Sequence, residues 1–253
     1  METDVAADNV QILGILNVTS DSFSDGGRFL DTADAVAHGR QLIEDGADII
    51  DIGAQSTNPD AEYITAQQEL ERLTPVVQQL KAEGIRISVD TFRPQVMRAM
   101  VAAGAEFVND VTALRDPEAV AAVRDCGARV ILMHSTATAA RAERADISAA
   151  GMVDRILAFF ERRLAELEAA GIERQRLIID PGMGVFLSRD PQASLAVLRE
   201  LPRLARFGAP ILVSTSRKGF IGDLLARGGQ RAPASQRAAG TLATELWAVL
   251  HGA

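Results

Sequence analysis

The chain has 253 residues, a formal net charge of −8, a hydrophobic content of 47% and one cysteine. No apolar run is long enough to cross a membrane, so we expect no membrane partner and a single globular domain over residues 1–253. The negative charge argues against a nucleic-acid partner, and Cys126 cannot form an internal disulfide. Since no secretory leader opens the chain, we expect a cytoplasmic location.

The first predicted element is a short strand that stops at Asn17. Residues 12–16 are apolar apart from one glycine, which is typical of a strand buried on both faces in a parallel sheet. A loop rich in Ser, Asp and Gly follows, through Gly27. Such a loop can order over a substrate and exclude water, and an ordinary polar turn is the alternative.

Glycines mark the junctions of a repeat. Six of them follow an amphipathic or Ala-rich segment and precede an apolar run, as a glycine at a helix end does. They are Gly46, Gly84, Gly104, Gly127, Gly171 and Gly208. The runs after them predict strands at Ile49–Ile52, Ile85–Val89, Phe107–Val108, Val130–Met133, Leu177–Ile179 and Ile211–Val213. With the first strand, the repeat has seven strands.

Helical signals fill the segments between these strands. We predict helices from Asp31 or Thr32 to Glu44, from a Thr65 cap to about Ala82, behind Pro94, behind Pro117, from Ile147 to Ala170, and behind a Ser235 cap. This alternation of strands and helices fits a (β/α)8 barrel or an open doubly wound sheet.

Polar side chains at the strand ends favour the barrel. A barrel brings all strand C-termini to one face, whereas an open sheet gathers only those at its switch point. Turn formation or helix capping is the alternative for any single residue, but not for the whole set. The set comprises Asn17, Asp51, Asp90, Asn109, Asp110, His134, Asp180, Ser216 and Lys218.

Seven motifs in this order resemble dihydropteroate synthase, and the likeness runs from about Ile12 to the end of the chain. The motifs are GILNVTSDSFSDGG, DIGAQSTNPDA, ISVDT, VNDV, LMHS, DPGMG and STSRKGFIG. The resemblance implies a (β/α)8 TIM barrel that joins p-aminobenzoate to 6-hydroxymethyl-7,8-dihydropterin diphosphate in folate biosynthesis. It also implies release of pyrophosphate with help from Mg²⁺, and a homodimer formed through the last helix.

The resemblance assigns roles to individual residues. Asp180 should accept the adjacent ring N–H and amine of the pterin, and Asp90 and Lys218 are the expected catalytic residues. Asn17 should contact diphosphate and its Mg²⁺, which takes few protein ligands. The full substrate-binding set is Asp51, Thr57, Asp90, Asn109, Met133, Asp180, Ser214, Ser216 and Lys218. Arg217 is a further candidate for the p-aminobenzoate carboxylate, but an Arg at a barrel mouth is more often paired with a neighbouring acid. His134 is ambiguous, because a lone His after an apolar strand is more often structural than catalytic. Neither residue is included in the set.

Some positions depart from the family pattern. Asn58 stands where most members have Arg, Ala54-Gln55 where they have Gly-Glu, and Ser214 where they have Gly. The missing Arg removes a bidentate phosphate donor. The chain resembles the mobile sulfonamide-insensitive synthases in its LMHS and NPDA motifs, in Phe186-Leu187-Ser188 after DPGMG, and in Ser214. This resemblance predicts reduced sulfonamide sensitivity.

The sequence stops at Ala253, where an eighth strand and helix would follow, so we expect these two elements of the barrel to be missing from it. Two other functions stay open on the residues alone. One is a pterin-binding methyltransferase domain of a corrinoid system, and the other is a non-catalytic pterin-binding homologue.

Overall fold

A computed structural model of the chain describes residues 10–18, 32–55, 63–137 and 148–253. The chain divides into two compact units. The N-terminal unit comprises residues 11–132 with 170–172, and the C-terminal unit comprises residues 133–169 and 173–253, with residues 1–10. The single domain over residues 1–253 stays a prediction.

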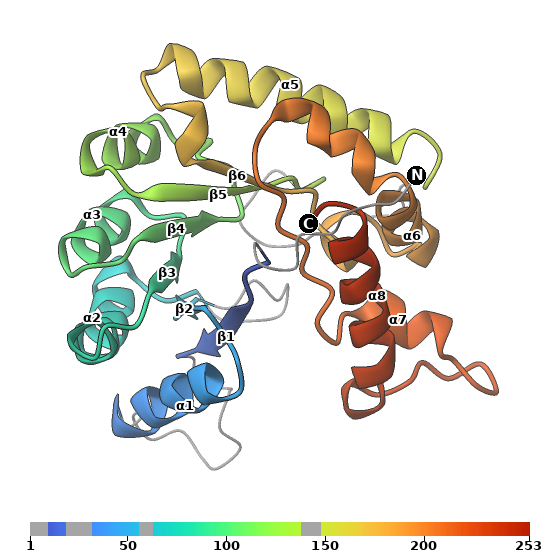
Figure 1. Cartoon of the computed structure of the whole chain (residues 1–253), viewed down its shortest axis with the longest axis horizontal. Coiled ribbons are helices and arrows are strands. Elements are labelled where there is room, and N and C mark those ends of the chain that lie inside the picture. The colour runs from blue at the N-terminus through green and yellow to red at the C-terminus, as the bar shows by residue number, and fades with distance from the viewer. Residues whose placement is uncertain (1–9, 19–31, 56–62, 138–147) are drawn as a thin grey trace. The chain divides into compact units, whose positions relative to one another are not determined.

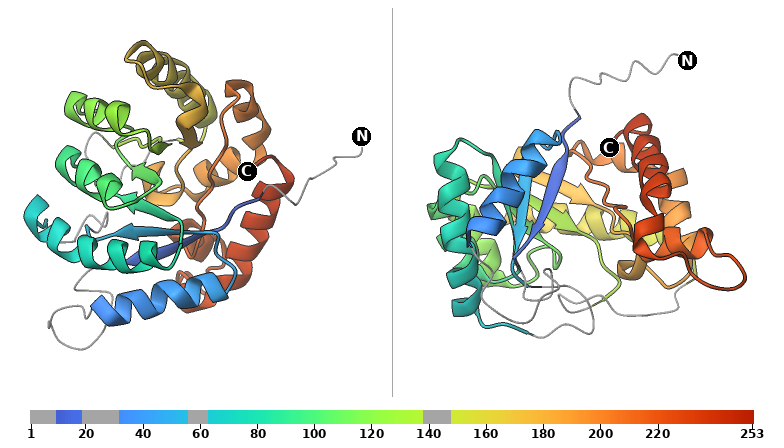
Figure 2. Two further views of the ribbon diagram at one scale, coloured as in Figure 1. Left: turned by 60° about the vertical axis from the view of Figure 1, so that its left-hand side comes forward. Right: turned by 90° about the horizontal axis from the view of Figure 1, so that it is seen from below.

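The N-terminal unit is built of alternating strands and helices. Its elements are β1 (Leu13–Asn17), α1 (Thr32–Glu44), β2 (Ile49–Gly53), α2 (Ala66–Ala82), β3 (Ile87–Asp90), α3 (Pro94–Ala102), β4 (Phe107–Asp110), α4 (Pro117–Cys126) and β5 (Arg129–Met133). Consecutive strands pair in parallel. Helices α1 to α4 all lie on one face of these strands (Figures 1 and 2). A doubly wound sheet carries helices on both faces, so this unit has the arrangement of a barrel.

The local signals in the sequence explain these elements. Thr65 and Gln68 form the capping box of α2, with the Thr65 Oγ1 accepting from the Gln68 N–H (3.2 Å) and the Gln68 side chain accepting from the Thr65 N–H (2.8 Å). Pro94 and Pro117 occupy first helical turns, as predicted. All six junction glycines have positive φ angles, which also confirms their prediction.

The C-terminal unit is richer in helix. It contains α5 (Met152–Ala169), β6 (Leu177–Asp180), α6 (Pro191–Arg199), α7 (Gly219–Leu224) and α8 (Ala238–Leu250), with the 3₁₀ helices η2 (Arg174–Arg176), η3 (Gly184–Phe186), η4 (Leu201–Phe207) and η5 (Ala234–Gln236). Its single described strand, β6, follows α5 and η2 in the chain. Within this unit the His134 N–H, directly after β5, donates to the Asp180 carbonyl at the end of β6 (2.8 Å).

The predicted seventh strand, residues 211–213, is reduced to one parallel bridge between Ile179 and Ile211. The Ile179 N–H donates to the Pro210 carbonyl and the Leu212 N–H to the Ile179 carbonyl, both at 2.9 Å. In a parallel ladder the next donor from the β6 side would be residue 181. Pro181 has no N–H, so the ladder ends there. Among the described residues, the predicted seventh strand therefore does not extend beyond this bridge.

Two predicted helix starts are wrong. Ser235 lies in η5, and α8 begins at Ala238 behind Arg237. Helix α5 begins at Met152 rather than at Ile147, because Gly151 has a φ of 75° and cannot continue an α-helix. Ile147 itself lies outside the described residues.

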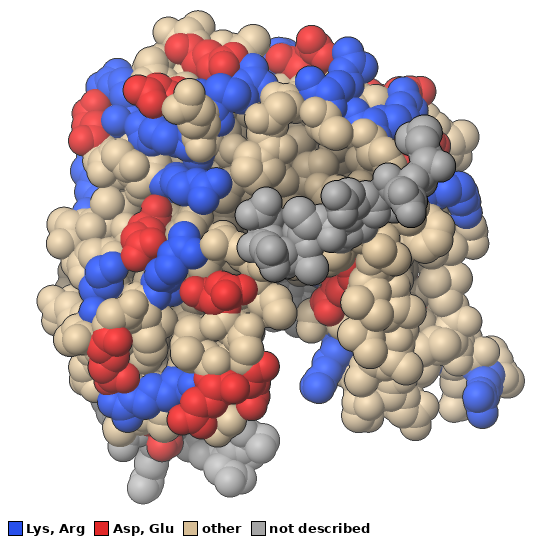
Figure 3. Space-filling view, viewed as in Figure 1, with Lys and Arg blue, Asp and Glu red and all other residues tan. Residues whose placement is uncertain are grey.

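None of the described helices is long and apolar enough to cross a membrane. On the face shown in Figure 3, Lys and Arg side chains of the N-terminal unit are interspersed with Asp and Glu. Elsewhere in this unit Arg40 forms an exposed ion pair with Glu83, and Glu106 forms partly buried ion pairs with Lys81 and Arg86. Interspersed charges give no broad positive field on that part of the surface.

Candidate active site

Predicted site residues of the N-terminal unit form one row across four strands. Asn17 pairs with Gly53, Gly53 with Asp90, and Asp90 with Asn109. A Cβ on Gly53 would lie only 3.3 Å from that of Asp90, so the glycine leaves the room that the aspartate needs. The paired register thus brings the C-terminal ends of β1, β3 and β4 together, as the sequence predicts.

Asp51 lies one row deeper on the same face. It precedes Gly53 by two residues and pairs with Ser88, and residues two apart on a strand share a face. The Asn109 Nδ2 donates to the Asp51 Oδ2 at 2.9 Å. Among the described residues the Asp51 Oδ1 accepts no hydrogen bond of regular geometry, although the nearby Ser88 hydroxyl stabilises the charged form of Asp51. Burial raises the pKa of Asp51, and Ser88 and Asn109 counteract that rise.

The pKa of Asp90 is shifted more strongly than that of Asp51 on the same face. Burial raises its pKa well above the ordinary value of 3.8, and the negative charges of Asp51, Asp110 and Glu69 raise it further. Like charges in a poorly solvated place destabilise each other. A ligand that brings hydrogen-bond donors or positive charge would therefore be stabilised next to Asp90.

Asp110, which ends β4, has a structural role. Its Oδ1 accepts from the Thr112 N–H and hydroxyl, both at 2.7 Å, and its Oδ2 accepts from the Leu114 N–H at 2.8 Å. Ala113 and Leu114 have φ angles of 55° and 56°, in the left-handed region that non-glycine residues seldom occupy. The buried carboxylate holds this strained turn in place.

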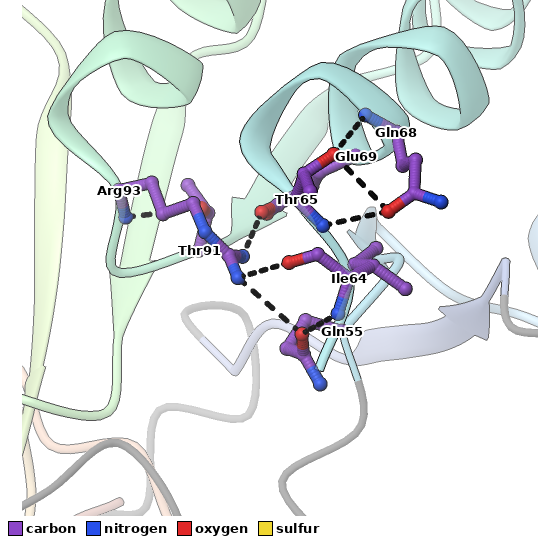
Figure 4. A network of polar contacts seen from close by, with 7 residues as sticks. All are labelled: Gln55, Ile64, Thr65, Gln68, Glu69, Thr91 and Arg93. Carbon is purple, nitrogen blue, oxygen red and sulfur yellow. Dashed lines mark hydrogen bonds and ion pairs between the residues drawn. The ribbon is translucent and has the colours of Figure 1, made fainter. Parts of the chain in front are cut away.

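A second polar network, which sequence reasoning missed, lies at the start of α2 (Figure 4). Glu69 is fully buried and forms an ion pair with Arg93. The Arg93 Nη2 also donates to the Ile64 carbonyl (2.6 Å) and, at 3.4 Å, to the Gln55 Oε1. The Ile64 N–H donates to the same Gln55 oxygen at 3.0 Å. The network ties together the end of β2, the start of α2 and the segment after β3.

One signal in the sequence points to this network. Glu69 stands four, seven and eleven residues before Leu73, Val76 and Leu80, so it occupies the buried stripe of α2. A carboxylate on an apolar stripe requires a partner, because burying an unpaired charge is costly. The spacing could therefore have predicted a buried ion pair, although not that Arg93 supplies it.

In the C-terminal unit, Asp180 is held where β6 ends. Its Oδ1 accepts from the Gly182 N–H at 2.7 Å, and the side chain is buried. Gly182 has a φ of 76°, and a Cβ there would lie 2.3 Å from the His134 carbonyl oxygen. Burial raises the pKa of Asp180, while Lys218 and the Gly182 N–H lower it. The carboxylate is thus fixed by its own DPGMG turn.

Lys218 is the charged neighbour of Asp180. Its N–H donates to the Thr215 carbonyl at 3.0 Å, and it precedes α7. Its Nζ lies 5.3 Å from the centroid of the Phe186 ring. Burial lowers the pKa of Lys218, and Asp180 opposes that shift. Ser214 is half-buried and Ser216 is exposed in the same short segment.

The remaining predicted residues are distributed differently. Met133 ends β5 and is buried. His134 is buried, and its ring meets that of Phe159 edge to face at 5.1 Å, in keeping with a structural role. Thr57, Asn58 and the loop through Gly27 lie outside the described residues. The structure therefore brings together Asp51, Asp90 and Asn109 in one unit, and Asp180 and Lys218 in the other.

The donor set is compatible with a magnesium ion that arrives with diphosphate. Among the described residues, no three His, Cys, Asp or Glu side chains are grouped so as to hold a metal ion. Mg²⁺ commonly takes one or two protein ligands together with phosphate oxygens and water. The amide oxygen of Asn17, at the end of β1, fits that limited role.

Comparisons with known proteins agree with this architecture. Residues 13–253 match the family described as pterin binding enzyme. Dihydropteroate synthase type-2 of Escherichia coli is 42% identical, over 96% of this chain and 88% of that protein. The type-3 synthase of Escherichia coli is 39% identical, over 96% of this chain and 91% of that protein. A Xanthomonas albilineans dihydropteroate synthase solved with 4-aminobenzoic acid is 44% identical, with a TM-score of 0.87 over 97% of this chain and 86% of that one.

The fold and its polar strand ends define an α/β enzyme of the pterin-binding class with the TIM-barrel architecture of its structural neighbours. The chain belongs to the dihydropteroate synthase family, whose members are transferases. The same Xanthomonas albilineans enzyme has also been solved with 7,8-dihydropteroate, at 42% identity and a TM-score of 0.83.

Proposed function

We propose that this chain condenses 6-hydroxymethyl-7,8-dihydropterin diphosphate with p-aminobenzoate to form 7,8-dihydropteroate and pyrophosphate. The observation that carries the proposal is the group formed by Asp51, Asp90 and Asn109, where an amide and two carboxyl groups with raised pKa share one face at strand ends. A pterin edge offers adjacent N–H donors and ring acceptors, which suit this combination. The family assignment supports the same substrates.

Asp180 and Lys218 supply the second part of the proposed site. Asp180 keeps acceptor capacity beyond its bond with the Gly182 N–H, so it can take the pterin ring N–H and exocyclic amine together. Lys218 then donates to the carbonyl side of the ring. The family resemblance assigns substrate binding to both groups of residues, and their substitutions test the two groups separately.

The proposed chemistry is a substitution at the pterin methylene carbon. The carbon–oxygen bond to diphosphate breaks, and the p-aminobenzoate nitrogen forms a bond to the same carbon and then loses a proton. Positive charge develops on the pterin, and negative charge grows on the leaving group. Asp90 stabilises that positive charge, because a cation relieves its repulsion with the neighbouring carboxylates.

Mg²⁺ would stabilise the departing diphosphate. Asn17 is the proposed protein contact to the ion and its diphosphate, at the end of β1. An aromatic amine is already a neutral nucleophile, so the chain need not provide a strong base. The proposed role of Lys218 is therefore to hold the pterin in the orientation in which the amine can attack.

We propose that p-aminobenzoate lies beside Ser216, Lys218 and Thr57, and that Ser214 reduces the fit of sulfonamides. Ser214 is half-buried and directly precedes the buried Thr215, so its hydroxymethyl group adds bulk where the family has glycine. A larger mimic of p-aminobenzoate loses more from that bulk than the substrate does.

We further propose a homodimer formed through α8. Leu242, Leu246 and Leu250 are more than half exposed on this helix, with relative exposures of 59%, 55% and 56%. Trp247 is 45% exposed and donates its indole N–H to the Leu198 carbonyl at 2.9 Å. Such a row of exposed apolar side chains supports a protein interface.

Pyrophosphate release tests the reaction. Mixing the protein with both substrates and Mg²⁺ should release pyrophosphate and 7,8-dihydropteroate, and omission of either substrate should abolish release. Methyl transfer from methyltetrahydrofolate to cobalamin would instead assign the chain to the corrinoid methyltransferases. Pterin binding without either reaction would identify a non-catalytic homologue.

A further inference from the structure

The residue before Lys218 has an unusual backbone. Arg217 has a φ of 49°, in the left-handed region that β-carbon sterics make unfavourable for all residues except glycine. Nothing in the Arg217 side chain favours this conformation, since arginine has no short polar group that bonds its own backbone. The surrounding structure must therefore maintain it.

Two side chains at the start of α8 bind both polar groups of the Arg217 backbone. The Arg217 N–H donates to the Thr241 Oγ1 at 2.9 Å, and the Arg217 carbonyl accepts from the Arg237 Nη1 at 2.8 Å. Arg237 is fixed in turn, because its Nε donates to the Ala232 carbonyl at 2.9 Å. Thr241 is buried, so water does not compete with the Arg217 N–H for its hydroxyl.

A third contact secures the other end of the same turn. The Thr215 and Thr244 hydroxyls lie 2.8 Å apart, and Thr215 is fully buried. The Lys218 N–H closes the turn by donating to the Thr215 carbonyl. Two residues of the turn, Thr215 and Arg217, are thus bound to α8 or to the residue that precedes it. Lys218 is the residue at which the turn leads into α7.

The backbone of Arg217 sets the direction of Lys218. A change of φ at one residue rotates everything that follows it, so a return of Arg217 to negative φ would move the Lys218 side chain away from Asp180 and Phe186. Asp180 is independently fixed by the Gly182 N–H and would not follow. The relation between the two charged groups therefore depends on the contacts of the Arg217 backbone.

We propose that Thr241 and Arg237 are positioning residues that hold the Arg217 backbone and so keep Lys218 directed at the pterin beside Asp180. This inference rests on the proposed function, in which Lys218 contacts the pterin. It gives α8 a role in substrate binding that is independent of any part in a dimer.

The test compares Thr241→Val with Thr241→Ser, alone and in a Lys218→Met background, by calorimetry with 6-hydroxymethyl-7,8-dihydropterin. Valine keeps the shape of threonine and removes the oxygen. We expect Thr241→Val to weaken binding about tenfold and Thr241→Ser to leave it within about twofold, the sizes set by one hydrogen bond of typical strength. In the Lys218→Met background, Thr241→Val should add no further loss, since residues that act through one another are not additive.

Thr74→Val is the matched control, because the Thr74 hydroxyl donates only within α2, to the Leu70 carbonyl at 2.7 Å. It should leave pterin affinity unchanged. Equal losses from Thr241→Val with and without Lys218, or no loss at all, would overturn the inference. If Thr241→Val does not fold, Arg237→Lys, which keeps a donor, should bind better than Arg237→Met.

Amide hydrogen exchange separates this inference from the proposed function. In the ligand-free protein, Thr241→Val should speed exchange of the Arg217 N–H, whereas Thr241→Ser and Thr74→Val should not. If the unaltered protein binds no pterin, the proposed function fails, but the exchange rates still test the positioning of the turn. Unchanged Arg217 exchange in Thr241→Val would refute the positioning itself.

Discussion

The carboxylate of Glu69 and the guanidinium of Arg93 form an ion pair inside the N-terminal unit, with the Glu69 side chain fully buried and that of Arg93 14% exposed. Burial raises the pKa of Glu69, whereas Thr91 and Arg93 lower it. The same guanidinium bonds to Ile64 and Gln55, on either side of the segment that joins β2 to α2. Arg93 therefore both compensates a buried charge and fixes the chain around it.

Replacing Arg93 with Met should destabilise the protein strongly. Loss of one partner of a buried pair leaves an uncompensated charge and costs about 3 to 5 kcal/mol of unfolding free energy, measurable by urea denaturation. Glu69→Gln in the Arg93→Met background should recover part of that loss, because an amide is easier to bury than a carboxylate. Arg40→Met, which breaks an exposed pair with Glu83, should have little effect. Similar losses in Arg93→Met and Arg40→Met would count against the buried pair.

Asp90→Asn should stabilise the ligand-free protein at neutral pH while weakening pterin binding. The folded pKa of Asp90 is raised, so the stability it contributes is complete below its ordinary value of 3.8 and is lost as pH rises through the folded pKa. An asparagine side chain does not titrate, so the variant keeps this part of the unfolding free energy at neutral pH. The gain is about 1.4 kcal/mol for each pH unit between the unfolded and the folded pKa of Asp90. Thermal unfolding from pH 4 to pH 8 should show an advantage that grows with pH. An advantage that is constant across this range would exclude a titrating Asp90 as its source.

Asp180→Ala should remove the main pterin anchor. The adjacent donors of the pterin would face an unfilled place, at a cost on the order of 2 to 5 kcal/mol of binding. Asp180→Asn should also bind poorly, because an amide cannot accept two donors side by side as a carboxylate can. Calorimetry measures both variants. An unchanged pterin affinity would remove Asp180 from the site.

The exposed row on α8 should determine the oligomeric state. Sedimentation at micromolar concentration should show a dimer for the unaltered protein and a larger monomer fraction for Leu246→Lys, because a charge at the centre of an apolar interface is poorly solvated. Leu224→Lys, at an exposed position of α7, is the matched control and should leave the dimer intact. A monomeric unaltered protein would refute the proposed interface.

Ser214→Gly should increase sulfonamide sensitivity selectively. Removal of the hydroxymethyl group should lower the inhibition constant of sulfamethoxazole more than it changes the KM for p-aminobenzoate, because the larger mimic gains more from the added space. Neutral drift is the competing explanation. Equal shifts in the two constants, or strong inhibition of the unaltered enzyme, would support drift and leave the synthase assignment intact.

Much of the N-terminal unit was predictable because its signals are local. Glycines at helix ends, a Thr65 cap and prolines in first turns each act within a few residues. The prediction of a seventh strand was wrong because the strand is cut short by Pro181, which directly follows its neighbour β6. Apolar composition at residues 211–213 cannot show that the partner lacks an N–H.

The site was predictable to a similar extent. Asp51, Asp90 and Asn109 end or nearly end consecutive strands, and parallel pairing in chain order then suffices to place them together. The contacts of Thr241 with Arg217 could not be predicted, because they join residues 24 positions apart through an irregular turn. Long-range contacts with irregular backbone leave no periodic signal in a sequence.

The close approach of Gly182 to the His134 carbonyl limits how this chain can vary. A side chain at position 182 would meet a main-chain oxygen, and every amino acid at position 134 carries that oxygen. A clash between two side chains can be relieved by a smaller residue at either position, but no substitution of His134 can make room for a side chain at position 182. We therefore regard Gly182 as a position closed to escape mutations, so an inhibitor that depends on the shape of the DPGMG turn would contact a part of the enzyme that cannot readily change.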